Sequence, residues 1–248
     1  MSSPPAQHAE SKHESNFVNG AWVPPVDGGY IPNVNPATNR ILCMIPSSTA
    51  ADVDAAAKAA KAAFPAWKAL SYEERANYLD KIAAGIESRL DSMAQVESED
   101  SGKPLSLARR IDIPRAVANF RFFAGAVRHD EVGAHHMGDA INYTSRSPVG
   151  IAGLITPWNL PIYLLSWKVA PALAMGNCIV AKPSELTPRS AIMLAEICKE
   201  VGLPDGVFNL VHGLGASCGQ AICEHPDINL ISFTGGTVTG RRVAATAA

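Results

Sequence analysis

"VGIAGLITPWNLPIYLLSWKVAPALAMGNCIVAKPSELTP", residues 149–188, decides the fold. It begins with the apolar run "VGIAGLIT", which has strand length, and continues into "PIYLLSWKVAPALAMG", which has the length and apolar character of a buried helix. "NCIVAKP" is a second apolar run of strand length. A strand, a helix and a strand over short connections predict a βαβ unit with two parallel strands.

The same alternation continues to the end of the chain. "TPRSAIMLAEICKEVG" (187–202) predicts a helix with Pro188 at its first position, and "GVFNLVHG" (206–213) and "INLISFTGG" (228–236) predict two more strands. Strands that are apolar along their whole length are typical of a sheet covered on both faces. The sequence therefore predicts an α/β fold with a Rossmann-like parallel sheet and helices on both faces.

The residues before this region predict a different organisation. Short strand-like runs with turns at Asn19-Gly20 and Asp27-Gly28 indicate an N-terminal arm. Thr49 with Asp52, and Ser71 with Glu74, mark two helix starts, and a third helical stretch (105–128) contains Pro114 as a kink or break. "DAINYTSRSP" (139–148) alternates like an exposed strand, and the polar residues 1–15 predict a disordered tail.

Composition excludes several classes of protein. Lys and Arg number 21 against 23 Asp and Glu, so the chain lacks the basic excess of a nucleic-acid-binding protein. Prolines and a lysine interrupt the most apolar stretch, which argues against a membrane span, and the N-terminus has no apolar signal-peptide core. Five cysteines without a C-x-x-C pair predict reduced, mostly buried thiols in a cytoplasmic protein.

Two strand ends carry candidate functional side chains. Lys182 and Glu185 in "AKPSE" are either partners for vicinal ribose hydroxyls or a solvated ion pair in a loop. Asn159, held between prolines in "TPWNLP", is either a rigid amide donor for a developing oxyanion or an ordinary turn residue. Trp158 beside it either lines a cofactor site or packs against the protein.

The glycine, histidine and arginine motifs of the chain mainly argue against particular kinds of site. The dinucleotide fingerprint G-x-G-x-x-G is absent, and Gly235 and Gly240 have P-loop spacing without the required lysine, which disfavours a Walker A nucleoside triphosphatase. His135-His136 has no further ligand at metal-binding spacing, so we expect no metal site. Arg115 and its neighbouring arginines are either carboxylate-binding forks or solvated helix residues.

Taken in order, "FVNGAWV", "NPAT", "TPWNLP", "AKPSELTP", "GLPDGVFNLVHGLG" and "ISFTGG" resemble the cofactor-binding half of the NAD(P)-dependent aldehyde dehydrogenase superfamily. The resemblance covers the chain from about Phe17 to its end. "LARRIDIPRAVANFRFFAG" and "PWNLPIYLLSWKVAPALAMGN" look closest to the 2-aminomuconic semialdehyde dehydrogenase branch, which implies the tryptophan–kynurenine catabolic route. Residues 16–129 would then be the arm and helices of the NAD-binding domain, 130–148 an oligomerisation segment, and 149–248 the Rossmann-like core.

The resemblance also implies roles for individual residues. Asn159 would donate its amide to the oxyanion of a thiohemiacetal, and Arg115 would anchor a substrate carboxylate. Lys182 and Glu185 would hold the adenosine ribose of NAD, and the charge of Glu185 would disfavour NADP. The remaining residues implied to border the cofactor are Ile155, Thr156, Pro157, Trp158, Gly215, Phe233, Thr234, Gly235 and Gly236. Many members of the superfamily have Ser where this chain has Gly236.

The catalytic Cys and Glu of the superfamily lie in motifs C-terminal to "FTGG", and neither motif occurs in these 248 residues. The resemblance therefore implies a truncated chain whose catalytic domain is absent and which is inactive alone. It implies a small aldehyde substrate and a homo-oligomer for the full-length form. Two alternatives are a non-catalytic nucleotide-binding or assembly module that pairs with full-length subunits, and an unstable product without a role.

Overall fold

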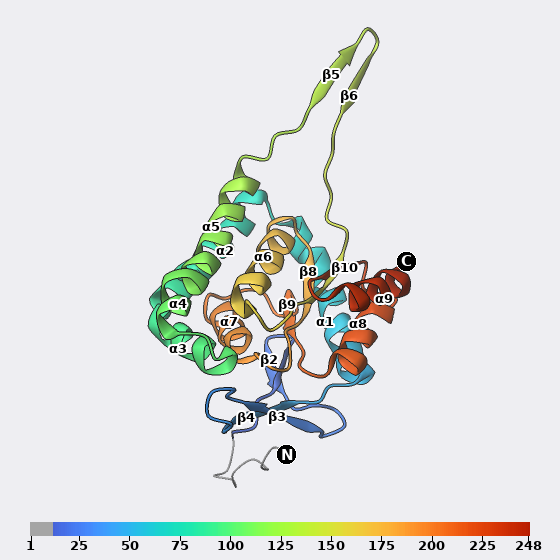
Figure 1. Cartoon of the computed structure of the whole chain (residues 1–248). Coiled ribbons are helices and arrows are strands. Elements are labelled where there is room, and N and C mark those ends of the chain that lie inside the picture. The colour runs from blue at the N-terminus through green and yellow to red at the C-terminus, as the bar shows by residue number, and fades with distance from the viewer. Residues whose placement is uncertain (1–11) are drawn as a thin grey trace.

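Four parallel strands form the centre of the computed structural model, which describes residues 12–248 (Figure 1). They lie in the order β10-β7-β8-β9 and are β7 (Ile151–Ile155), β8 (Cys178–Lys182), β9 (Phe208–Leu210) and β10 (Leu230–Phe233). Every residue of β7, β8 and β9 is buried. The parallel sheet predicted from residues 149–236 is therefore confirmed.

Two strands of the N-terminal arm extend this sheet beyond β9. β1 (Asn16–Val18) pairs antiparallel with β9 through Phe17 and Leu210, and β2 (Ala21–Val23) pairs antiparallel with β1. Asn19 and Gly20 make the predicted turn between them, with φ angles of 52° and 72° that favour Asn and Gly. Within residues 12–248 the sheet thus has six strands, and it is mixed because β1 pairs antiparallel with β9.

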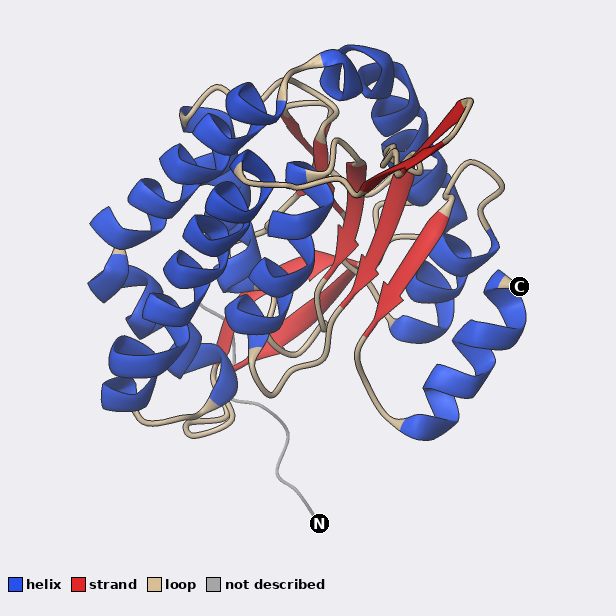
Figure 2. Cartoon of the chain, turned by 90° about the horizontal axis from the view of Figure 1, so that it is seen from above, coloured by secondary structure: helices blue, strands red, loops and turns tan. Residues whose placement is uncertain are grey.

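Helices cover both faces of the sheet (Figure 2). The helices on either side are α1 (Ala50–Ala69), α6 (Pro161–Ala174), α7 (Arg189–Glu200) and α8 (Gln220–Glu224). α1 contacts β7, β8 and β9 as well as α8, whereas α6 and α7 contact strands and each other on the other side. α2 (Tyr72–Ser88), α3 (Leu90–Ser101) and α5 (Ile113–Arg128) form an outer layer against α6 and α7.

Two predicted helix starts are present, and the third helical stretch is more irregular than its sequence indicated. The Ser71 N–H donates to Glu74 Oε2 at 2.7 Å, and the Thr49 N–H donates to Asp52 Oδ2 at 2.9 Å. Residues 105–128 divide into α4 (Leu105–Leu107), the π-helical segment η1 (Ala108–Asp112) and α5. Pro114 is the second residue of α5 and directly follows the π-helical segment, so the helix is irregular near the predicted kink or break, although the helical backbone continues through it.

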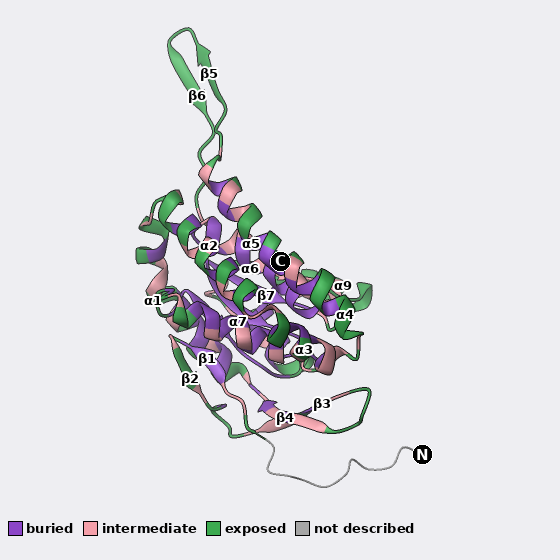
Figure 3. Ribbon diagram, turned by 90° about the vertical axis from the view of Figure 1, so that its left-hand side faces the viewer, coloured by how far each residue is buried: buried purple, intermediate pink, exposed green. Residues whose placement is uncertain are grey.

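Two hairpins lie outside the main sheet. β5 (Ala134–Met137) and β6 (Ala140–Tyr143) form a hairpin that projects from the body and has every residue exposed (Figures 1 and 3). β3 (Tyr30–Val34) pairs with β4 (Ile41–Pro46). Most of the tail predicted at residues 1–15 lies outside the described residues. Its last residues lie alongside β4, where the Glu14 N–H donates to the Met44 carbonyl at 2.8 Å.

A continuous apolar core joins the sheet to both helix layers. Trp67 of α1, Phe120 of α5 and Phe208 of β9 are among its largest fully buried side chains. None of the helices in residues 12–248 is both long enough and apolar enough to pass through a membrane. The core leaves the carboxyl ends of the parallel strands as the place where loops from different parts of the chain meet.

Candidate functional site

A cleft of about 410 Å³ opens at the carboxyl ends of β7, β8 and β10. This is the edge at which doubly wound sheets bind ligands. All eleven residues that the sequence assigned to cofactor binding line this one cleft: Ile155, Thr156, Pro157, Trp158, Lys182, Glu185, Gly215, Phe233, Thr234, Gly235 and Gly236. Segments up to 81 residues apart, from 155 to 236, therefore contribute to one site, and their separate roles stay predictions.

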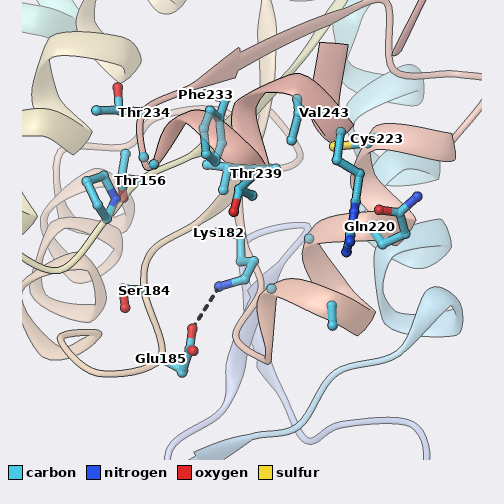
Figure 4. Close-up of a pocket in the computed structure, with 18 of the residues that line it drawn as sticks. Thr156, Lys182, Ser184, Glu185, Gln220, Cys223, Phe233, Thr234, Thr239 and Val243 are labelled. Carbon is cyan, nitrogen blue, oxygen red and sulfur yellow. Dashed lines mark hydrogen bonds and ion pairs between the residues drawn. The ribbon is translucent and has the colours of Figure 1, made fainter. Parts of the chain in front are cut away.

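Lys182 and Glu185 stand together in the wall of the cleft (Figure 4). Lys182 ends β8 and is almost fully buried, and its Nζ donates to the Pro183 carbonyl at 2.8 Å. It also lies 3.5 Å from Glu185 Oε2, whose side chain is about one-third exposed. The pair thus differs from a solvated surface ion pair, because the ammonium is held within the protein while the carboxylate faces the cleft.

The "FTGG" turn places a helix N-terminus beside this pair. α9 (Thr237–Ala247) begins after Gly236, and no side chain caps its first N–H groups. Such free N–H groups, together with the helix dipole, favour a bound anion such as phosphate. A Cβ at Gly236 would meet nothing within 4 Å, whereas one at Gly235 would lie 2.4 Å from the Phe233 ring.

One buried polar atom in the cleft has an unused hydrogen-bonding capacity. Thr156 is 3% exposed, and its Oγ1 has no partner among residues 12–248. Buried hydroxyls in native proteins are nearly always hydrogen-bonded, so this atom is an exception in the wall of the cleft. Trp158, by contrast, is 57% exposed and presents a large apolar surface to the same cleft. The donor set therefore fits a ligand with hydroxyls, a phosphate and a flat apolar group.

Asn159 and Arg115 lie outside the lining of this cleft. Asn159 is exposed and follows Trp158 in the loop between β7 and α6. Arg115 is an exposed residue of α5, and its guanidinium carbon lies 5.6 Å from the centre of the Tyr163 ring, in the first turn of α6. Both predicted substrate-side residues are thus near the start of α6.

The cysteines do not offer an activated thiol within the described residues. All five are free and buried, as the sequence predicted. Burial raises the pKa of the Cys43, Cys178 and Cys218 thiols to about 12. Cys223 lines the cleft, and burial followed by the charge of Glu224 raises its pKa too. No group of three or more metal-ligating side chains is close enough to hold a metal ion in residues 12–248.

Sequence reasoning missed part of the cleft wall. The additional lining residues are Ser184, Ala216, Gly219, Gln220, Cys223, Thr239, Arg242 and Val243. Ser184 could have been found because it lies within "AKPSE". The others come from η2 (Gly215–Gly219), α8 and α9, and only the packing of α8 beside α9 brings them together.

Comparison with known proteins gives a consistent result. Residues 22–248 match the model of the aldehyde dehydrogenase family. The chain is 49% identical over 231 residues to the 2-aminomuconic semialdehyde dehydrogenase of Danio rerio, a match that covers 92% of this chain and 47% of that protein. It is 45% identical over 244 residues to the 2-hydroxymuconic semialdehyde dehydrogenase of Pseudomonas sp. (strain CF600), covering 96% of this chain and 50% of that protein.

A solved structure agrees. An aldehyde dehydrogenase from Bacillus cereus, determined as its NAD+ complex, superimposes with a TM-score of 0.92 at 39% sequence identity. The match covers 95% of this chain and 49% of that one. The chain thus spans about half the length of the curated relatives it matches.

Proposed function

Because this chain belongs to the aldehyde dehydrogenase family, we propose that it is the cofactor-binding portion of an NAD-dependent enzyme that oxidises a semialdehyde to its carboxylic acid. The observation that carries the proposal is the single cleft in which Lys182, Glu185 and the "FTGG" turn meet. The similarity to a Bacillus cereus aldehyde dehydrogenase solved with NAD+ supports the choice of cofactor.

The residues of the cleft fit the parts of NAD. Lys182 would donate to one ribose hydroxyl, and the Glu185 carboxylate would accept from its neighbour. The N–H groups at the start of α9 would receive the pyrophosphate, as helix N-termini do in other dinucleotide sites. NAD supplies the hydride acceptor when bound, and the role of these residues is to hold it in a fixed orientation.

Asn159 and Arg115 would act on the substrate. In this proposal the Asn159 side-chain amide donates to the oxyanion that develops on the aldehyde carbon, where a fixed donor is most effective. The Arg115 guanidinium would receive a carboxylate of the substrate, a role that its planar fork suits. The Arg115 guanidinium lies over the Tyr163 ring, in the first turn of α6. This position supports the role, because Asn159 lies in the loop just before the same helix.

The substrate class follows from this anchor and from the relatives. Two of the relatives described above are named for muconic semialdehydes, compounds that carry an aldehyde and a carboxylate. We propose a substrate similar to 2-aminomuconate semialdehyde and, with it, a place in the tryptophan–kynurenine catabolic route. Five buried free thiols support a reducing, cytoplasmic location.

We further propose that these 248 residues do not catalyse the oxidation alone. None of the five cysteines is exposed, and burial raises the pKa of each thiol, so the described residues lack a thiolate nucleophile. Chain-dependent NADH formation from short aldehydes would contradict this point.

Calorimetric titration of the purified chain with NAD tests the proposed cofactor role. We expect saturable binding that Lys182→Met weakens about tenfold or more, because the variant loses a buried charged donor. Lys61→Met, which removes an exposed ion pair with Asp227, is the control and is expected to leave binding unchanged. Wild-type chain that does not bind NAD would overturn the proposal.

The exposed β5–β6 hairpin supports the alternative of an assembly module. All of its residues, including Ile141 and Tyr143, are exposed, and two apolar side chains on a projecting strand suit pairing with another subunit. If assembly is its role, Ile141→Ser with Tyr143→Ser will abolish co-purification with full-length homologues. Unchanged co-purification would count against this function, and NAD binding by the chain would be compatible with either function.

A further inference from the structure

Three ionisable side chains from different segments meet next to the loop that carries Asn159. Glu97 comes from α3, Lys103 from the loop that follows it, and Asp112 from the end of η1. Lys103 Nζ lies 2.6 Å from Asp112 Oδ2 and 3.9 Å from Glu97 Oε1. The side chains of both acids are essentially inaccessible to solvent, and that of Lys103 is 10% exposed.

This cluster, composed of Glu97, Lys103 and Asp112, hydrogen-bonds the loop at two points. Lys103 Nζ donates to the backbone carbonyl of Asn159 at 3.3 Å. Three residues later, the Ile162 N–H donates to Glu97 Oε1, also at 3.3 Å. The cluster therefore holds the chain on both sides of the start of α6, at Asn159 before the helix and at Ile162 inside it.

The Asn159 side chain itself has no hydrogen bond to residues 12–248, and it is exposed. The point from which it projects is consequently set by the backbone of this loop. A donor for a developing oxyanion must be held within about 0.5 Å of its productive position. Whatever fixes this backbone therefore limits the positions that the amide can reach.

We propose that Lys103, held by Glu97 and Asp112, is a positioning residue that fixes the direction of the Asn159 amide. The inference rests on the proposed role of Asn159 as the oxyanion donor. A buried ammonium is an expensive way to stabilise a fold, since apolar side chains of similar volume serve at least as well. An ammonium does what an apolar side chain cannot, because it makes directional hydrogen bonds to a carboxylate and a carbonyl at once.

The same cluster links Asn159 to the proposed substrate anchor. Asp112 ends the π-helical segment η1, and Arg115 follows it in the first turn of α5. Such π segments are frequent at functional sites. One ammonium therefore connects the segment that presents Arg115 to the loop that presents Asn159.

α5 and α6 are joined a second time further along. Asn119 Nδ2 donates to Ser166 Oγ at 2.9 Å and to the Tyr163 carbonyl at 3.3 Å. The two helices are thus joined near the loop that carries Asn159 and again between Asn119 and Ser166.

The structure offers a matched control at the other end of α6. Arg75 is also a buried cation that donates to a backbone carbonyl, with its Nε 2.9 Å from the Ala174 oxygen. Arg75→Met and Lys103→Met therefore each remove a buried cation from one end of the same helix. Asp112→Asn is a milder second variant, because it keeps the shape of the side chain and removes its charge.

Hydrogen–deuterium exchange of the 248-residue chain tests the inference. We expect Lys103→Met, and to a smaller extent Asp112→Asn, to raise exchange of the Ile162 amide about tenfold or more relative to wild type. Arg75→Met should raise exchange near residues 174–177 and leave Ile162 as in wild type. Equal exchange of Ile162 in wild type and both cluster variants would overturn the proposal. An increase in the cluster variants that is spread evenly over the whole chain would overturn it too.

Kinetics separate positioning from mere support of the fold. In the full-length enzyme, Lys103→Met should lower kcat about 10- to 100-fold and change KM less than about threefold, for acidic and neutral aldehydes alike. If Lys103→Met raises exchange of the Ile162 amide but leaves kcat unchanged, the inference is wrong. NAD titration of the same chain tests the proposed function independently. If the wild-type chain does not bind NAD, the proposed function fails, while the exchange of Ile162 still tests whether Lys103 holds the loop.

Discussion

Lys182 Nζ and Glu185 Oε2 lie 3.5 Å apart in the wall of the cleft, with the ammonium buried and the carboxylate partly open to solvent. This asymmetry matters for cofactor choice. Two of the three donors of the buried ammonium go to the Pro183 carbonyl and to Glu185, which leaves one for a ribose hydroxyl, and the Glu185 carboxylate is the more exposed charge that a ligand in the cleft meets.

We therefore predict that Glu185 excludes NADP. Glu185→Gln should narrow the preference for NAD over NADP about tenfold or more, because it removes the repulsion of a 2′-phosphate. Titration of both cofactors measures the effect. Glu200→Gln, a carboxylate of α7 outside the cleft, provides the charge-matched control and should leave the ratio unchanged. Tighter binding of NADP than of NAD by the wild-type chain would refute the prediction.

The two glycines of the "FTGG" turn should respond differently to substitution. Gly235→Ala should weaken NAD binding about tenfold, because its Cβ would lie 2.4 Å from the Phe233 ring and must displace a residue of the cleft wall. Gly236→Ala should be tolerated, since a Cβ there meets nothing within 4 Å. Gly236→Ser should strengthen binding a few-fold by adding a hydroxyl donor for phosphate. Similar affinities for all three variants would show that the turn does not contact the ligand.

Arg115 should determine the preference for acidic substrates. In the full-length enzyme, Arg115→Ala should raise KM for carboxylate-bearing semialdehydes about 30-fold or more while changing KM for neutral aldehydes little. Arg121→Ala is the matched control, because Arg121 lies on the same helix and is already paired with Glu87. Equal effects of Arg115→Ala on both substrate classes would remove the anchor.

His212 predicts a specific loss of stability in acid. Burial, and then the charge of Lys182, lower the pKa of His212 to about 3, and neither ring nitrogen has a partner among residues 12–248. Between about pH 3 and 6.5 the unfolded chain binds a proton that the folded chain does not, so the free energy of unfolding falls as the pH falls through this range. Stability is fully present above about pH 6.5.

Urea unfolding at several pH values measures this effect. His212→Gln should remove the dependence, so that relative to the variant the wild type loses about 2 kcal/mol between pH 6.5 and 4.5. The exposed His129→Gln is expected to follow the wild type. Parallel curves for wild type and His212→Gln would contradict the prediction.

Much of the fold could be predicted because its signals are local. Apolar runs of strand length, with helices between them, indicate parallel strands, and the end of each strand can be read directly from "TPWNLP", "AKPSE" and "FTGG". Since parallel strands end at the same edge, three separate motifs imply one site. The structure gathers the eleven residues that the family resemblance implied for the cofactor around one cleft.

The remaining features depend on contacts between distant residues. The contact between Lys103 and Asn159 spans 56 positions, and neither "SGKP" nor "PWNLP" indicates it. The pairing of β1 with β9 joins Phe17 to Leu210 and follows from the shape of the completed sheet. Pro114 marks where the helix becomes irregular, but the sequence does not show that the irregularity is a π-helical segment packed against α3.

The central claim is that the carboxyl ends of β7, β8 and β10 together bind NAD, and a crystal structure of the 248-residue chain grown with NAD tests it most directly. The account predicts density for the ribose against Lys182 and Glu185, and for the pyrophosphate at the N–H groups that follow Gly235. NAD bound elsewhere on the chain, with this cleft filled only by solvent, would contradict it.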